Sequence, residues 1–177
     1  MCHQCNLNPV YEFTNKRKFC KTCYIRWFEK KFLYTIRRFK LIKKGDLISY
    51  KKSKNFREVV LEYLLKMYSQ KGTIKLSIRK SKKFASFDTA DIASKKILES
   101  ILKKNILNLK KDKSVKPLIL FLDKEILLYA KLKNLKFNKE KKQNTEITNF
   151  IEELEKKHPE IKQAIVRGIL VNNKPLC

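Results

Sequence analysis

The chain has 177 residues, 43% of them hydrophobic, which is enough for one domain with a core and a small appendage. Forty-three Lys and Arg against seventeen Asp and Glu give a formal charge of +26, so we expect a polyanion such as nucleic acid as partner, with a Lys-rich compositional bias as the alternative. A membrane span and a secretory signal are not expected, because the longest apolar run is interrupted by Asp123, Lys124 and Glu125 and no basic segment precedes an apolar one, which predicts a cytoplasmic protein.

Four cysteines near the start of the chain follow the pattern C-x2-C-x14-C-x2-C: Cys2, Cys5, Cys20 and Cys23. Two tight turns with this spacing can present four thiolates to one tetrahedral ion, whereas disulfides would not persist in a reducing compartment. The pattern predicts a structural Zn²⁺ site, closed to substrate, whose binding energy is largely folding energy. His3 is an alternative ligand to Cys2, and Cys177 has no Cys or His near it in sequence.

Between the cysteine pairs, residues 10–19 alternate enough apolar side chains for a short hairpin that turns near Asn15 and Lys16. A helix is predicted over residues 21–43, because apolar residues recur there at three- to four-residue steps. The expected core stripe of this helix is Tyr24, Phe28, Phe32, Ile36 and Phe39.

Basic side chains fill the hairpin turn and the remainder of this helix and its exit. Each one alone indicates no more than a solvated surface, but together they predict a face that follows the phosphates of tRNA or another structured RNA. Trp27 and Tyr34 lie among them and serve either stacking on bases or packing. The candidate RNA-binding residues are Lys16, Arg17, Lys18, Arg26, Lys30, Arg37, Arg38, Lys40, Lys43 and Lys44.

A strand over residues 47–50, a polar loop over 51–55 and a helix over 56–68 form the layout of a phosphate-binding turn. Such a turn needs glycines, so that backbone N–H groups can cradle the phosphates at the helix N-terminus, and residues 51–55 contain none. We therefore assign no catalytic residue and no nucleotide-binding residue, and we expect ATP to bind weakly.

The middle of the chain predicts further strands and helices. Alternation of Ile74, Leu76 and Ile78 predicts a half-buried strand, and a second short strand ends near Phe87. A helix follows with Asp88 as its cap and Asp91 in its first turn.

The last third of the chain predicts one more strand and three helices. The apolar run 116–122 predicts a strand, and Asp123 is expected to cap a helix over 124–134. Residues 136–144 indicate an exposed linker, and residues 145–170 indicate two helices broken at His158 and Pro159.

The stretch "FCKTCYIRWFEKKFLYTIRRFKLIKKGD" is similar to the zinc finger and basic helix that open the archaeal and eukaryotic cytosolic tRNA 2-thiolation proteins, members of the PP-loop ATP pyrophosphatase superfamily. "FASFDTADIASKKILESIL", "KPLILFLDKEILLYAKLKN" and "FIEELEKKHPEIKQAIVRGIL" resemble later units of that family. The resemblance implies an α/β fold with a zinc finger and basic helix at 1–44, a reduced PP-loop-like domain at 45–137, and a linker with C-terminal helices at 138–177.

The chain departs from the family where the family's chemistry lies. The SGGKDS-type loop falls on residues 53–58, where only Ser53 coincides, and Phe87 stands where a histidine is expected, although Asp91 matches an acidic position. No cysteine for sulfur transfer lies between Leu65 and Lys83. The resemblance implies ancestry in ATP-dependent thiolation of a tRNA uridine, while these residues predict a shortened, degenerate tRNA-binding relative without that chemistry.

Three alternatives stay open. The protein acts alone as a pseudoenzyme or as the partner of an active thiolation subunit. It is instead a zinc-finger protein associated with another RNA or with the ribosome. Or it is an active tRNA thiolase with an altered nucleotide site, so whether the chain is an enzyme is undecided from the sequence.

Overall fold

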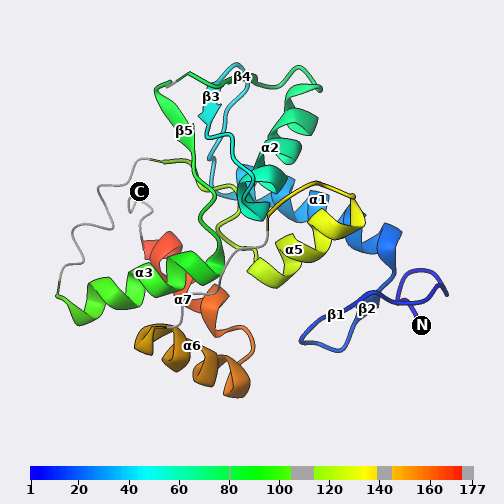
Figure 1. The fold of residues 1–177 in the computed structure, drawn as a ribbon, viewed down its shortest axis with the longest axis vertical. Coiled ribbons are helices and arrows are strands. Elements are labelled where there is room, and N and C mark those ends of the chain that lie inside the picture. Colours follow the sequence, from blue (N-terminus) through cyan, green and yellow to red (C-terminus); the bar gives the residue numbers. More distant parts are fainter. Residues whose placement is uncertain (80, 105–113, 139–144, 173–177) are drawn as a thin grey trace.

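The computed structural model describes residues 1–79, 81–104, 114–138 and 145–172 (Figure 1). The fold is mixed α/β, as predicted, with a two-stranded antiparallel hairpin and a three-stranded parallel sheet in the order β4-β3-β5. The elements are β1 (Tyr11–Glu12), β2 (Lys18–Phe19), α1 (Lys21–Arg38), β3 (Leu47–Tyr50), α2 (Phe56–Ser69), β4 (Lys75–Ser77), β5 (Lys83–Ala85), α3 (Ala90–Leu102), α5 (Asp123–Leu132), α6 (Glu146–Lys157) and α7 (Ile161–Asn172).

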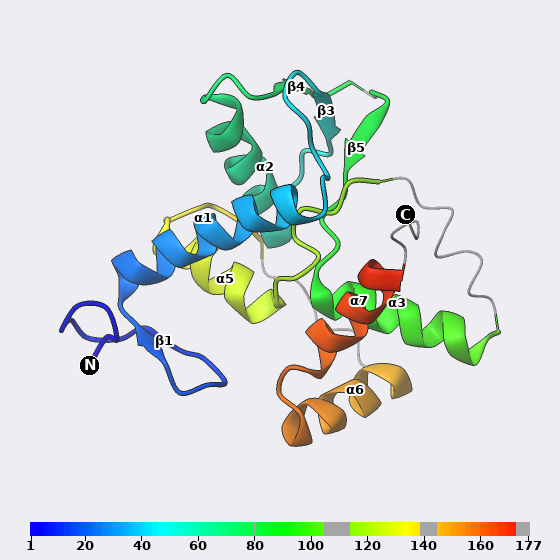
Figure 2. The same ribbon diagram turned by 180° about the vertical axis from the view of Figure 1, so that it is seen from behind.

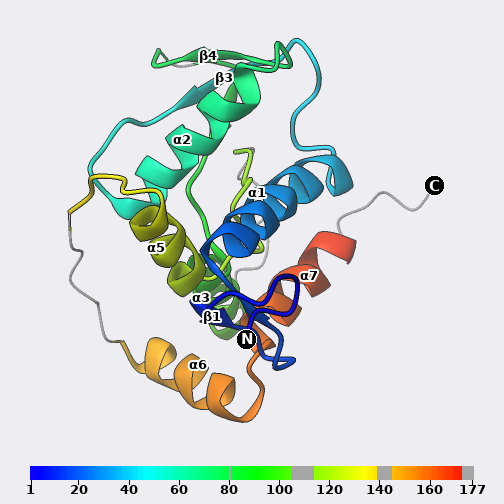
Figure 3. The same cartoon turned by 90° about the vertical axis from the view of Figure 1, so that its right-hand side faces the viewer.

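The main core takes in side chains of α1, α2 and α5, and α5 contacts both of the other helices (Figure 3). The α1 side chains Tyr24, Phe28, Phe32 and Ile36 are buried, which confirms that part of the predicted apolar stripe. Phe39, the last predicted member, lies beyond the helix, is half-buried and packs against the second core. The Phe28 ring stacks on the Tyr129 ring of α5, with centroids 4.1 Å apart, and meets the Phe121 ring at 4.5 Å. Stacked and tilted aromatic pairs of this kind add to the stabilisation from area burial alone.

Helix α1 ends at Arg38 and not at the predicted Lys43, because Lys40 adopts the left-handed conformation with φ of 49°. The Leu41 N–H donates to the Ile36 carbonyl at 3.0 Å, and the Lys40 N–H donates to the Arg37 carbonyl at 3.2 Å. These two bonds make a Schellman motif, in which glycine is the usual residue at the left-handed position. Lysine at that position hid the end of the helix from sequence inspection.

The apolar run 116–122 is not a strand, contrary to prediction. Val115 makes a single bridge to Ala85, and the chain then turns, with the Phe121 N–H donating to the Leu118 carbonyl at 2.9 Å. Leu118 and Phe121 enter the main core, whereas Ile119 and Leu120 enter a second core against α3 and α7. A short apolar run indicates that its side chains are buried but does not fix the backbone conformation. Here a turn directs the side chains of the run into two different cores.

The strand predicted around Ile74, Leu76 and Ile78 is also shorter than expected. Strand β4 covers only Lys75–Ser77, and it pairs with β3 in parallel. Ile78 therefore lies beyond the strand and is 69% exposed, so its predicted inward orientation is wrong.

Both predicted acidic helix caps are wrong, because lysine or arginine side chains pair with the two carboxylates. Thr89, not Asp88, caps α3, accepting from the Ile92 N–H at 3.3 Å. Buried Asp88 instead pairs with Lys96 at 2.9 Å and with Lys116. Helix α5 begins at Asp123 with Leu122 as its N-cap residue, and Asp123 pairs with Arg57 of α2.

Helices α6 and α7 lie beside α3 at one end of the molecule (Figure 2). The predicted break at His158 and Pro159 is confirmed, because α6 ends at Lys157 and α7 begins at Ile161. Lys162 of α7 joins the helices by pairing with Asp91 of α3 at 2.7 Å and with Glu155 of α6.

Most of the predicted linker, residues 139–144, lies outside the described residues. None of the described helices is both long enough and apolar enough to cross a bilayer.

One buried ion pair fastens α1 to α5. The Lys31 ammonium lies 2.7 Å from the Glu125 carboxylate, with only 15% and 4% of the two side chains exposed. Glu125 also accepts from the Leu122 N–H at 2.9 Å, and its backbone carbonyl accepts from the Tyr24 hydroxyl at 2.9 Å. Burial lowers the pKa of Lys31, and the Glu125 carboxylate opposes that shift, so each charge depends on its partner.

We expect Glu125→Gln to lower the free energy of unfolding by about 3 kcal/mol or more, because Lys31 is left charged and buried without its partner. The glutamine oxygen can still accept from the Leu122 N–H. The double variant Lys31→Met, Glu125→Gln is expected to recover most of the loss, since no unpaired buried charge then remains at this contact. Urea titration measures both, with the exposed Glu153→Gln as control.

A double variant as unstable as Glu125→Gln would show that the unpaired charge is not the cause. The control change should stay within about 0.5 kcal/mol of the wild type.

Candidate metal centre and nucleic-acid interface

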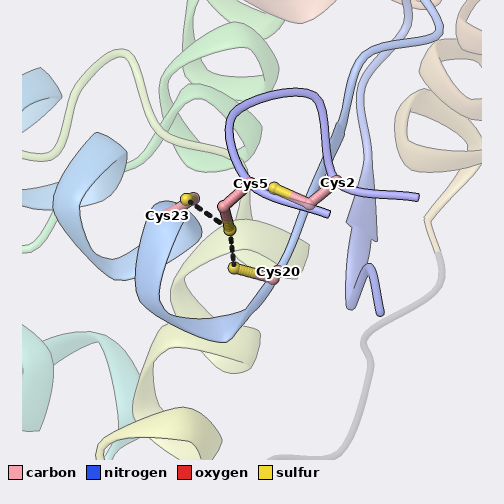
Figure 4. A group of neighbouring side chains, drawn as sticks. All are labelled: Cys2, Cys5, Cys20 and Cys23. Carbon is pink, nitrogen blue, oxygen red and sulfur yellow. Dashed lines mark hydrogen bonds between the residues drawn. The ribbon is translucent and has the colours of Figure 1, made fainter. Parts of the chain in front are cut away.

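The four cysteines predicted as ligands come together at the start of α1 (Figure 4). Cys20 is the N-cap residue of α1 and Cys23 lies in its first turn, while Cys2 and Cys5 lie on the N-terminal loop. All four sulfur atoms lie within 4.8 Å of one another. The Cys5 Sγ is 3.4 Å from the Cys20 Sγ and 3.5 Å from the Cys23 Sγ. This group could hold one metal ion.

Backbone hydrogen bonds of the loop and hairpin hold the cysteines in place. The Cys2 N–H donates to the Leu7 carbonyl at 3.0 Å, which closes the first turn. The His3 N–H donates to the Lys18 carbonyl at 2.8 Å, which ties that turn to β2. The side chain of His3 is exposed and is not part of the metal-ligand group, so four thiols complete the site without it.

The pKa values of two of the thiols, Cys2 and Cys23, are shifted in opposite directions. Against the opposing effect of burial, backbone hydrogen bonds from Gln4, Cys20 and Cys5 lower the pKa of Cys2 to about 6. A hydrogen bond to Cys5 and burial raise the pKa of Cys23 to about 12. Four thiolates this close repel one another, so only a cation at their centre lets all four ionise.

The sulfur spacing fits a single tetrahedral ion. Sulfur atoms about 2.3 Å from one zinc must lie close to one another, as these four do. A four-iron cluster binds each cysteine at a different iron, which spreads the sulfur atoms farther apart. Three cysteines of the group are buried and the fourth is half-buried, which leaves a closed site suited to holding structure together.

All ten candidate RNA-binding side chains are exposed. Lys16, Arg17 and Lys18 lie on the hairpin, and two of them neighbour Glu12, with Lys18 at 3.2 Å and Lys16 at 3.9 Å. Lys40, Lys43 and Lys44 follow α1 at its exit.

Within α1, the candidate basic residues form a stripe. Arg26, Lys30 and Arg37 are spaced i, i+4 and i+11, which places them on one helix face, and Arg38 lies beside it. Trp27, by contrast, packs against other aromatic rings, with the Phe13 centroid 4.6 Å away. We define the basic stripe as Arg26, Lys30 and Arg37.

The position of the expected phosphate-binding turn is filled by the chain's own side chains. Asn55 caps α2 by accepting from the Arg57 N–H at 2.9 Å, and the Asn55 N–H donates to the Ser53 hydroxyl at 3.0 Å. The Ser53 hydroxyl in turn donates to the carboxylate of buried Glu58. A carboxylate thus lies in the first turn of α2, where an anionic ligand would bind.

A second carboxylate reaches the same helix end. The Arg57 guanidinium binds Asp123 of α5 in two places, from Nε at 2.8 Å and from Nη2 at 2.5 Å. Sequence inspection missed Glu58, Lys31 and Glu125. A charged residue within an apolar helical pattern, as at Lys31 and Glu58, is the signal that could have revealed them.

The described architecture is similar to that of a solved enzyme. The U34-tRNA thiolase NcsA from Methanococcus maripaludis, solved with its [4Fe-4S] cluster, matches the fold with a TM-score of 0.76. The match covers 99% of this chain and 89% of that chain at 17% sequence identity, and this likeness shows a shared fold. No protein-family model and no curated protein sequence matches the chain.

We expect Cys20→Ser to abolish stoichiometric metal binding and to unfold the hairpin, because the binding energy of a structural metal is largely folding energy. Native mass spectrometry should count one ion in the wild type and none in the variant, and hydrogen exchange should report the loss of protection in residues 1–20. Cys177→Ser is the control and should keep the metal. A folded hairpin in metal-free protein would contradict this expectation.

Proposed function

We propose that the chain is a tRNA-binding relative of the tRNA 2-thiolation proteins, with a structural Zn²⁺ and without ATP-dependent chemistry of its own. The fold shared with a U34-tRNA thiolase carries the proposal, and the exposed basic residues on and around α1 supply the binding surface. The protein works in the cytoplasm, as a pseudoenzyme or beside an active thiolation subunit.

Zinc is the metal that the site favours. The chain has five cysteines, and the four that lie together have sulfur spacing suited to one tetrahedral ion. The [4Fe-4S] cluster belongs to the thiolase with the similar fold, and this chain has no second group of cysteines in its sequence to hold one.

The zinc site and the basic stripe form one unit in this proposal. The metal fixes the start of α1, and the Schellman motif at Lys40 fixes its end. Arg26, Lys30 and Arg37 therefore keep a defined spacing along a rigid helix, as phosphate recognition requires. We assign residues 1–44 to this RNA-docking unit, 45–137 to the reduced α/β domain and 138–177 to the linker and C-terminal helices.

Loss of the nucleotide site is supported by the first turn of α2. In active PP-loop relatives the resemblance implies a glycine-containing loop that receives phosphates. Here the Asn55 N–H donates to the Ser53 hydroxyl, and that hydroxyl donates to Glu58. The N-terminus of a helix attracts anions, but at α2 the negative charge of Glu58 repels a triphosphate. ATP should therefore bind poorly at this position.

A second candidate function uses the same surface. A formal charge of +26 is more than one short helix needs, which favours a zinc protein that associates with ribosomal or other structured RNA. The RNA that crosslinks to the protein in cells separates the two, because tRNA is expected from the first and rRNA from the second.

Replacing Arg37 and Arg38 with Ala should weaken tRNA binding and reduce the slope of log affinity against log salt by about one to two units. The reason is that fewer phosphates are then neutralised on binding, so fewer counterions are released. Both side chains are exposed, so the fold should be unchanged. Fluorescence anisotropy across a salt titration measures the slope.

The matched control is Lys103 and Lys104, another exposed basic pair at the end of a helix, α3. Replacing that pair with Ala should leave the slope nearly unchanged. Equal losses from both pairs would mean that charge is diffuse and that no defined RNA face exists.

A further inference from the structure

A cavity of about 300 Å³ opens between the hairpin, α1, the turn before α5 and the start of α7. That volume is at the small end of ligand sites, so it suits a single nucleotide or less. The wall from α1 consists of Trp27, Lys31 and Tyr34, spaced i, i+4 and i+7 on one face. This face adjoins the basic stripe on the same helix.

The aromatic rings of the cavity have different surroundings. Trp27 is packed, with Phe13 at its edge and the Lys31 ammonium 4.8 Å from its ring centre. Tyr34 is 58% exposed, and within the described part of the chain no other aromatic ring contacts it. Its ring is therefore available as a stacking platform at the mouth of the cavity.

The inner wall offers hydrogen-bonding groups. Lys31 uses one of its three donors on Glu125, which leaves donors for a ligand. Gln163 of α7 donates to the Leu120 carbonyl at 3.3 Å, and its side-chain oxygen can accept. A polar edge with both acceptors and a donor would match these two side chains.

The rim carries two arginines from opposite sides, Arg17 of the hairpin and Arg167 of α7. Neither forms a salt bridge with any described residue, whereas Glu12 at the same rim is paired with two lysines. Glu160 is held by the Thr14 hydroxyl at 2.9 Å. The Thr14 hydroxyl does not neutralise Glu160, so the rim charges outside the salt bridges of the described residues are two arginines against one glutamate. The balance at the mouth is cationic, and guanidinium groups suit phosphate.

We propose that this cavity binds one unstacked nucleotide of an RNA whose duplex part lies on the basic stripe. The base stacks on Tyr34 with its polar edge towards Lys31 and Gln163, and the phosphate lies between Arg17 and Arg167. This rests on the proposed RNA-binding function and adds to it a preference for single-stranded positions. A paired base within a duplex cannot enter, because it is stacked on both faces.

The test compares a hairpin RNA that has a single-stranded loop with a blunt duplex of equal length and charge. The wild-type protein should bind the hairpin more tightly. Tyr34→Ala should weaken hairpin binding at least about fivefold and leave duplex binding unchanged, because stacking on the lost ring is specific to an unpaired base. Phe84→Ala, which removes a 40% exposed ring on β5, is the matched control and should change neither affinity.

Trp27 is the sole tryptophan of the chain and lines the cavity, so its fluorescence reports entry directly. Hairpin RNA should change the Trp27 emission in the wild type, and blunt duplex should not. Equal weakening of both RNAs by Tyr34→Ala, or an unchanged Trp27 signal with bound hairpin, would overturn the cavity proposal alone. No binding of either RNA by the wild type would overturn the proposed function together with it.

Discussion

The buried carboxylate of Glu125 is the contact on which the arrangement of the N-terminal half depends. The carboxylate accepts hydrogen bonds from Lys31 of α1 and from the Leu122 N–H in the turn before α5. The backbone carbonyl of Glu125 accepts a hydrogen bond from the Tyr24 hydroxyl. Helix α1 is therefore fixed in position and in rotation against α5. Since one face of α1 is buried by this contact, the remaining faces are presented to solvent in a fixed order, and these carry the basic stripe and the wall of the cavity.

The group of four cysteines, which could hold one metal ion, lies at the start of the same helix. Cys20 and Cys23 belong to the first turn of α1, so a metal bound there attaches the hairpin to a helix that is already held by the core. The hairpin also reaches the C-terminal helices, because Thr14 donates to Glu160 at 2.9 Å. Segments far apart in the sequence, the hairpin and the start of α7, are thus joined by a hydrogen bond.

The sequence allowed a good prediction of what depends on local periodicity. The buried part of the apolar stripe of α1, the grouping of the four cysteines and the break at Pro159 were predictable because spacing alone encodes them. The caps of α3 and α5 were not, since Asp88 pairs with Lys96 and Lys116, and Asp123 pairs with Arg57 of α2. The end of α1 was missed because Lys40 takes a conformation usual for glycine.

The candidate site divides in the same way. The positions of the metal ligands and the exposure of the basic residues follow from the chain near them. The cavity could not be foreseen, because Tyr34, Arg167 and Gln163 meet there only through the packing of α7 against the rest of the fold. Nor could the filling of the first turn of α2, which depends on Glu58 turning back to Ser53 and on Asp123 arriving from α5.

The central proposal is that a fold shared with a tRNA thiolase retains an RNA-binding end in this chain, while carboxylates at the start of α2 exclude nucleotide phosphates. Calorimetric titration with ATP in the presence of tRNA, followed by an assay for AMP and pyrophosphate, tests it most directly, with an active tRNA thiolase as positive control. We expect ATP to bind no more tightly than about millimolar, corresponding to about 4 kcal/mol, and no AMP to form. Micromolar ATP binding or AMP-forming turnover would contradict the account.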